Sequence, residues 1–207
     1  MIRTIAFWAA ITGYALLAVL IVAGGAAWPG YSHSSQFISE LGATGAPYGR
    51  LISLGGFLPI GVCVTLFAIL AAVIEPRGVL RTLGFLGLVL FASGYTVAAF
   101  FPCDFGCRPA TPSFSQMMHN LFGLGGYVFG PIGLILLGLT ARKWPGGRWL
   151  SPLGLICGLV AGAAFFGMGS DAPGLAQRVL EGAVALWILA CAFTLRRAPA
   201  SGGSSAA

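Results

Sequence analysis

Long runs of apolar residues, separated by short polar connections, dominate this chain. Six runs are long enough to cross a hydrocarbon core as helices, which takes roughly 20 residues each. They lie at about residues 5–27, 50–74, 83–101, 118–140, 150–169 and 179–195. Because the runs are continuously apolar and do not alternate, they do not fit barrel strands. The pattern predicts an all-α integral membrane protein, a six-transmembrane-helix bundle formed as one domain over residues 1–195.

The composition points to a membrane as the solvent of this protein. Hydrophobic residues make up 57% of the chain and charged residues 8%, whereas soluble domains average about 25% charged residues. The first apolar run is longer than the core of a usual signal peptide, so we expect it to stay in the protein as a span. Residues 196–207 are mostly small and polar, which predicts a disordered cytoplasmic tail.

The basic residues indicate how the spans are oriented. With the N-terminus in the cytoplasm, eight of the eleven Lys and Arg residues fall on the inner side, and Arg50, Arg108 and Arg178 fall on the outer side. Basic residues near span ends tend to stay cytoplasmic. We therefore predict a multi-pass protein of the cell membrane with both termini inside. Because the basic residues are scattered over separate inner segments, we expect no nucleic-acid partner.

Most of the other ionisable side chains fall on the outer side. Glu75 is the one acidic residue expected inside. The outer group consists of His33, Glu40, Asp104, His119, Asp171 and Glu181. An ionisable group at or within a membrane boundary is costly to bury, so each is a candidate for function.

The first outer loop, residues 31–50, carries a helical signal of its own. A serine at position 34 or 35 can cap a short helix that ends at Gly42. One face of this helix would be apolar, and Gln36 and Glu40 would share a polar side. We predict a structured extracytoplasmic loop, either a lid on the bundle or a solvated segment.

Cys103 and Cys107 share a second short outer loop. Gly106 lies between them and permits a tight turn. In an oxidising compartment this arrangement favours a disulfide, with free thiols or a metal pair as the alternatives. A bridge here would fix the position of Asp104.

His119, Asp104 and Glu40 are the candidate catalytic residues. His119 and Asp104, together with His33, could hold a divalent ion such as Zn²⁺, which would activate a bound water for hydrolysis. Alternatively, Asp104 could orient His119 as a base beside a loop serine such as Ser39. No recognised metal-binding spacing accompanies these residues.

Arg178 and Glu181 stand at the start of the sixth apolar run. They are three residues apart and so are neighbours on a helix, and Glu181 lies about one turn into the run. Two interpretations stay open: a structural ion pair between them, or separate contacts to a ligand, with Arg178 binding an anionic head group.

Three segments together resemble one family of membrane proteins. They are SSQFISELGATGAP, FPCDFGC followed by His119, and GLAQRVLEG. The combination is similar to the six-span proteins grouped as domain of unknown function 998, over about residues 5–195. The resemblance implies a six-span bundle but no particular activity. It implies recurrent motif positions at Ser39, Glu40, Gly42, Asp104, His119, Arg178 and Glu181.

These features favour an outward-facing polar pocket at head-group level that binds a lipid or a small amphipathic ligand. The candidate ligand-binding residues are His33, Ser39, Asn120, Asp171, Arg178 and Glu181. One alternative is a membrane hydrolase that acts on such a lipid with a metal or a histidine. Another is a non-catalytic scaffold or a partner subunit of another membrane protein. A transporter is less expected, because the span centres carry almost no charge.

Overall fold

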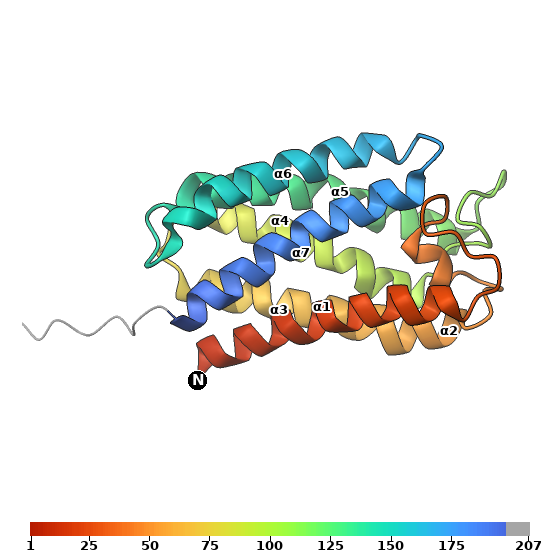
Figure 1. Cartoon of the computed structure of the whole chain (residues 1–207), viewed down its shortest axis with the longest axis horizontal. Helices are drawn as coiled ribbons and strands as arrows, with labels where there is room; N and C mark the ends of the chain where they lie inside the picture. The colour runs from red at the N-terminus through yellow and green to blue at the C-terminus, as the bar shows by residue number, and fades with distance from the viewer. Residues whose placement is uncertain (198–207) are drawn as a thin grey trace, which may run out of the picture.

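The computed structural model describes residues 1–197, which form helices joined by loops (Figure 1). Across this part of the chain, six helices are long and apolar enough to cross a membrane. Their main segments are α1 (Ile2–Ala26), α3 (Leu58–Ile74), α4 (Val79–Phe100), α5 (Phe114–Ala141), α6 (Leu150–Gly167) and α7 (Pro173–Arg197). The predicted all-α, six-span fold class is confirmed.

Short helical segments extend two of the spans and form part of one loop. α2 (Gly49–Ile52) and the π-helical turn η2 (Ser53–Phe57) continue α3 at one end, and η3 (Gly147–Trp149) leads into α6. A further 3₁₀ turn, η1 (Ile38–Gly42), lies in the first long loop. The π-helical turn ends two residues before Pro59, whose missing N–H disturbs regular helical bonding.

Helices α5 and α7 begin earlier than the apolar runs suggest. α5 begins at Phe114, not 118, because the Ser113 hydroxyl accepts the N–H of Gln116 at 3.1 Å and caps the helix. α7 begins at Pro173, not 179, and proline fits the first turn of a helix. At its other end α7 includes the first two residues of the predicted tail. The rest of that tail, 198–207, lies outside the described residues.

The six spans pack in chain order around a closed ring. Each span lies against the next one along the chain, and α7 returns to pack against α1. The N-terminus and the end of α7 lie at one end of the bundle, and the loops 27–48, 101–113 and 168–172 lie at the other, here called the loop end (Figure 1). The loop end therefore gathers residues from distant parts of the sequence.

Glycines allow neighbouring helices to approach closely. A Cβ added at Gly133 of α5 would lie 2.7 Å from the carbonyl oxygen of Gly84 on α4, and one at Gly154 of α6 would lie 2.9 Å from Gly138 Cα on α5. Such small-residue contacts are typical of helix packing in lipid. At Gly162, further along α6, the nearest atom to an added Cβ is 4.0 Å away, so the close approach of α6 to its neighbours does not extend along the whole helix.

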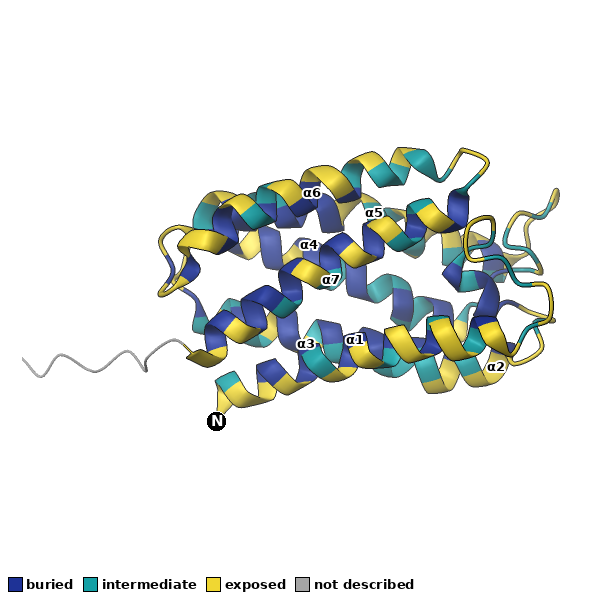
Figure 2. Cartoon of the chain, in the orientation of Figure 1, coloured by how far each residue is buried: buried dark blue, intermediate teal, exposed yellow. Residues whose placement is uncertain are grey.

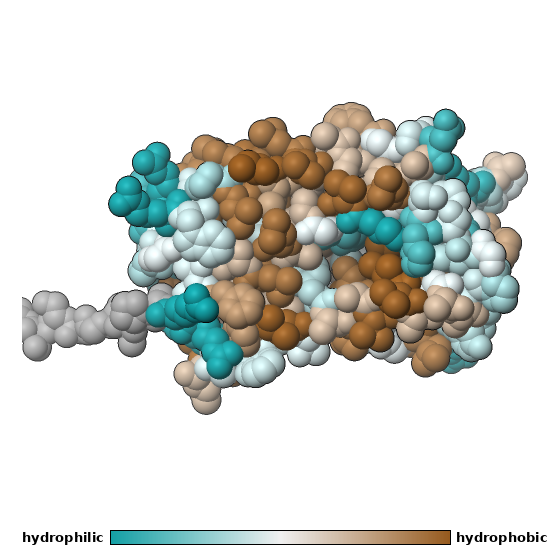
Figure 3. Space-filling view, in the orientation of Figure 1, coloured by the Kyte–Doolittle hydropathy of each residue, from teal (hydrophilic) through white to brown (hydrophobic). Residues whose placement is uncertain are grey.

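The surface of the bundle is apolar along its length and polar at its ends. The sides of the helices that face outward are exposed, while the inward sides are buried (Figure 2). Large apolar side chains such as Phe166, 82% exposed, lie on this outer surface. Hydrophilic residues gather at both ends (Figure 3). This distribution is that of a helical bundle with lipid as its lateral solvent.

Candidate functional site

The first long loop folds back over the loop end as a cap, defined here as residues 31–47. Ile38 and Leu41 of η1 are 2% and 1% exposed, so the predicted apolar face is packed on the bundle. Ser53 on η2 donates its hydroxyl hydrogen to the Gly42 carbonyl at 2.9 Å. The predicted serine cap is wrong, because η1 begins after Phe37, whose N–H donates to the Glu40 carboxylate at 2.9 Å.

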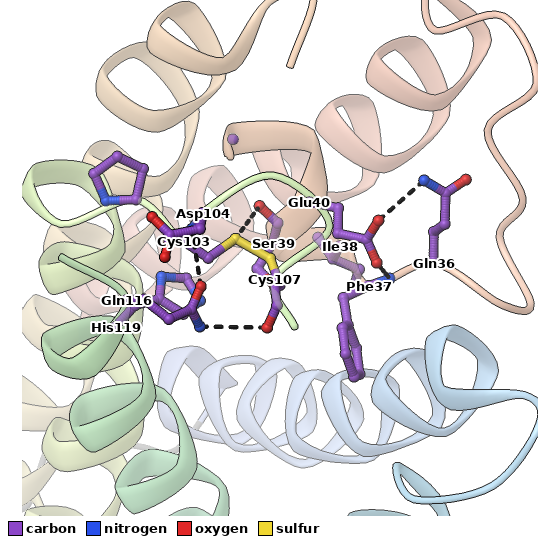
Figure 4. Close-up of a disulfide and its surroundings, with 12 residues drawn as sticks. Gln36, Phe37, Ile38, Ser39, Glu40, Cys103, Asp104, Cys107, Gln116 and His119 are labelled. Carbon is purple, nitrogen blue, oxygen red and sulfur yellow. Dashed lines mark hydrogen bonds between the residues drawn. A yellow bond between two sulfur atoms is a disulfide. The ribbon is translucent and has the colours of Figure 1, made fainter. Parts of the chain in front are cut away.

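Glu40 therefore has a structural partner set within the cap. Besides the Phe37 N–H, it accepts a hydrogen bond from the Gln36 side-chain amide at 3.0 Å. The predicted shared polar side of Gln36 and Glu40 is present, and in Figure 4 the Glu40 carboxylate points toward Gln36 and away from the disulfide. Glu40 is 6% exposed and closes the first turn of η1.

Beneath the cap lies a cavity of about 110 Å³, counted as the space open to the centres of water molecules. This is several times the roughly 10–15 Å³ that one water needs by the same measure. Most of its lining is apolar or aromatic, from η1, η2, α4 and α5. The polar lining residues are Ser39, Tyr95, His119, Asn120, Tyr127, Gln177 and Glu181.

Glu181 forms the polar floor of this pocket. It is 3% exposed, and its carboxylate accepts hydrogen bonds from the hydroxyls of Tyr95 on α4 and Tyr127 on α5, the latter at 2.8 Å. The Gln177 amide donates to the Tyr127 hydroxyl at 2.6 Å. Tyrosines and a glutamine from three helices thus hold one buried carboxyl group in the wall of a cavity.

Gln177 also ties the cap to the floor of the pocket. Its side-chain carbonyl accepts the buried N–H of Ile38 at 2.5 Å, across 139 positions of sequence. One amide therefore satisfies a backbone donor of the cap and a tyrosine of the floor at once. Sequence inspection did not place Gln177, Tyr95 or Tyr127 among the candidates, because uncharged residues within or beside apolar runs give no signal of their own.

His119 lies on the wall of the pocket near the second loop. Its Nδ1 is 3.2 Å from the Phe101 carbonyl oxygen, which can only accept, so Nδ1 carries the proton of this hydrogen bond. In the neutral ring Nε2 then keeps its lone pair. The next residue, Asn120, is exposed and accepts a hydrogen bond from the Gln116 amide at 2.7 Å.

Cys103 and Cys107 form the predicted disulfide, with their Cα atoms 5.0 Å apart. Figure 4 shows how Gln116 holds this loop: its carbonyl accepts the Asp104 N–H at 2.8 Å, and its amide donates to the Cys107 carbonyl at 3.3 Å. Gln116 is fully buried and is another residue that sequence inspection missed. Cys107 faces the cavity, and the Ser39 hydroxyl lies 3.5 Å from its sulfur.

Asp104 is used locally, at the start of α5. Its carboxylate accepts the Ser113 N–H at 3.0 Å and the Ser113 hydroxyl hydrogen at 2.7 Å. The backbone bond first, and then the hydroxyl bond, hold the pKa of Asp104 below its usual value. Since His119 Nδ1 donates to Phe101, the Asp104-oriented base considered above is not assembled.

Arg178 joins α7 to the cap and is not paired with Glu181. Its guanidinium donates to the Gln36 carbonyl at 2.9 Å and to the Tyr31 hydroxyl at 2.7 Å, and one of its nitrogens lies 3.1 Å from His33 Nδ1. Burial raises the pKa of Tyr31, and the bond from Arg178 opposes that rise. Arg178 and Glu181, whose spacing also allowed an ion pair, thus have separate partners in the structure.

The sequence candidates occupy different places at the loop end. Ser39, His119, Asn120 and Glu181 line the same pocket. His33 of the cap lies next to Arg178 of α7, and Asp171 is exposed in the loop between α6 and α7. The group His33, His119 and Asp104, considered for a metal, is therefore dispersed over three positions.

The fold and pocket define a multi-pass α-helical membrane protein. A family model described as "Protein of unknown function (DUF998)" matches residues 11–194. The chain belongs to this family, which confirms the resemblance found in its three motif segments. No curated protein and no solved structure matches the chain.

Proposed function

We propose that this protein binds a lipid or a small amphipathic ligand in the pocket beneath the cap. The observation that carries the proposal is Glu181, a buried carboxyl group that faces a cavity and is held by Tyr95 and Tyr127. Burying a carboxyl group in a membrane protein is costly, and such groups usually mark sites of function. A polar ligand group that reaches the floor would find an acceptor and two hydroxyls there.

The shape of the pocket supports an amphipathic ligand. Apolar walls from Phe57, Phe91 and Leu124 surround the polar floor, which is the usual arrangement of small-molecule sites. Leu124 is 49% exposed although it lines the pocket, so the cavity reaches the outer surface beside the first turns of α5. A lipid chain can approach from that side, where the surface meets the bilayer.

The proposal places the loop end outside the cytoplasm. Eight of the eleven Lys and Arg residues, including Arg3 and Arg197, belong to the segments at the opposite end of the bundle. This asymmetry favours cytoplasmic termini by the positive-inside rule. The proposed ligand site then lies at the outer head-group level of the cell membrane. The proposed partners are membrane lipids or a small amphipath, and the cap also offers a surface for a membrane-protein partner.

Binding is better supported than hydrolysis. A His-based hydrolase would need a group that orients the imidazole toward the substrate. Here the Phe101 carbonyl receives the His119 Nδ1 proton and Asp104 is bonded to Ser113. We therefore assign Glu181 and His119 as ligand contacts in this proposal, and Asp104 and Glu40 as residues that shape the loop and the cap.

Photolabelling tests the proposal with a matched pair of variants. The purified protein is placed in vesicles that contain a phospholipid with a diazirine in its acyl chain, and labelled peptides are mapped by mass spectrometry. Leu124→Trp should fill the mouth of the pocket and reduce labelling of pocket residues several-fold. Leu139→Trp, on the same helix and 55% exposed, should leave that labelling unchanged.

A second variant tests the floor of the pocket. Glu181→Gln keeps the side-chain shape and should alter which lipids stay bound through purification, as seen by native mass spectrometry. Equal labelling in both tryptophan variants, together with unchanged lipid retention in Glu181→Gln, would contradict ligand binding at this site.

A further inference from the structure

We infer that reduction of the Cys103–Cys107 disulfide converts this wall of the pocket into a Zn²⁺ site, with Cys103, Cys107 and His119 as its ligands. The two sulfurs and one imidazole nitrogen all lie within 4.8 Å of one another. They come from the second loop and from the first turns of α5. Among the residues that the structure describes, this is the group of histidine, cysteine and carboxylate side chains assembled closely enough to share an ion.

The spacing suits a tetrahedral ion once the sulfur–sulfur bond is open. With Zn–S near 2.3 Å and Zn–N near 2.0–2.1 Å, the ligand atoms of such a site lie roughly 3.5–3.8 Å apart. In this structure the three ligand atoms already lie within 4.8 Å of one another, which is slightly more than those distances. The change required is therefore a separation of the two sulfurs, with no large movement of the helix that carries His119.

The imidazole is held in the form that a metal requires. Because Nδ1 donates its hydrogen to the Phe101 carbonyl, Nε2 is the ring nitrogen with a free lone pair. A backbone carbonyl that accepts from the other ring nitrogen is the usual outer partner of a metal-bound histidine, and it fixes both tautomer and ring orientation.

The loop is anchored by bonds that do not depend on the sulfurs. Gln116 binds the Asp104 N–H and the Cys107 carbonyl, and the Cys103 carbonyl accepts the Thr44 N–H at 2.8 Å. The Cys107 N–H donates to the Asp104 carbonyl, also at 2.8 Å. These bonds persist when the bridge is reduced, so both thiols stay beside His119.

The charge balance favours a divalent ion. Reduction of the bridge takes two electrons and two protons, which a dithiol supplies as it forms its own disulfide. Metal binding then releases the two thiol protons, and two thiolates with one Zn²⁺ are neutral overall. A neutral centre suits this site, since Cys103 is fully buried. Three protein ligands leave the fourth position open, and Cys107 and His119 both line the cavity.

Cobalt titration tests this inference on the full-length protein in detergent. The protein is reduced with a phosphine under anaerobic conditions, and Co²⁺ is added as a spectroscopic probe. We expect one Co²⁺ per chain, with thiolate charge-transfer absorption that Zn²⁺ removes by displacement. The oxidised protein should show neither signal.

Variants identify the ligands. His119→Gln should weaken metal binding by more than the roughly 10- to 100-fold that follows loss of an outer partner alone. Cys107→Ser should remove the charge-transfer band. His33→Ala and Cys63→Ser are matched controls, because His33 lies beside Arg178 and Cys63 lies within α3, and neither should change binding.

The result also separates this site from the proposed lipid pocket. Reduced protein that binds no Co²⁺, equal binding in oxidised protein, or unchanged binding in His119→Gln would each overturn the metal site. Variants that unfold are recognised by size-exclusion chromatography, and His119→Gln, whose ring is only partly buried, then decides the question. Lipid photolabelling in the oxidised protein is independent of all these outcomes.

Discussion

Single uncharged side chains hold together the parts of this molecule that sequence inspection treated separately. Gln177 joins the cap to the floor, and Gln116 joins the second loop to α5. Both are buried and both use their carbonyl and their amide. A buried amide whose hydrogen bonds are all made costs little free energy of folding, whereas removal of its side chain leaves several buried partners unpaired.

Glu75 lies at the end of the bundle opposite the loop end, and it predicts that the stability of the protein depends on pH. It follows α3, is 5% exposed, and its burial raises its pKa from 4.5 to about 7, although Arg3 and Arg81 act in the opposite direction. The folded state therefore holds a proton that the unfolded chain releases. The stabilisation is fully present below about pH 4.5 and is lost as the pH rises through about 7.

Thermal melting in detergent measures this effect. The melting temperature of the native protein should fall between about pH 5 and about pH 8, and Glu75→Gln should flatten that slope because it removes the titrating group. Asp171→Asn, at an exposed carboxyl group, should retain the native slope. A Glu75→Gln protein with the same pH profile as the native one would refute the assignment.

The sequence identified residue types well but not their partners. His119 and Glu181 were picked out because ionisable groups are rare in this chain, and both line the pocket. Asp104 was picked out for the same reason, yet a carboxylate next to a helix start is readily used by the N–H and hydroxyl of a nearby serine. Arg178 binds the cap, 142 positions away, which spacing along one helix cannot reveal.

At the scale of helices, hydropathy marks the part of each span that contacts hydrocarbon. It predicted the number and order of the spans because roughly 20 apolar residues are needed to cross. It missed the polar turns at the starts of α5 and α7, which are stabilised by a serine cap and by proline. Those turns carry Gln116, Gln177 and Arg178, which hold the second loop and the cap, so the errors fall at the site.

The contact between α4 and α5 predicts a different response at two glycines of one helix. In Gly133→Ala the new methyl group would lie 2.7 Å from the Gly84 carbonyl oxygen and 3.3 Å from Gly87 Cα. Because backbone cannot easily move aside, we expect a loss of about 1–3 kcal/mol. At Gly125 no atom lies within 4 Å, so Gly125→Ala should be neutral or slightly stabilising.

Melting temperatures of the two variants in the same detergent check this prediction. The expected order is Gly125→Ala at or above the native protein and Gly133→Ala clearly below it. Similar values for both variants would mean that the two helices are not packed through this glycine.

For the whole molecule, the proposed orientation makes a direct prediction. Fluorescent protein fused after the last residue should fluoresce in a bacterial host, because it folds in the cytoplasm. Alkaline phosphatase inserted at Gly45, within the cap, should be active, because it needs the oxidising exterior. The opposite pair of results would place the pocket at the cytoplasmic surface.

The closed ring has a consequence for biosynthesis. The floor of the pocket needs Gln177 and Glu181 from the last helix, and α1 packs on both α3 and α7. Until α7 has been synthesised, the side of α1 that packs on α7 therefore stays uncovered. Tyr95 and Tyr127 then also lack their hydrogen-bond acceptor, Glu181. A nascent protein that stops before the final span is left without a finished site, so every functional copy is one whose translation reached its last helix.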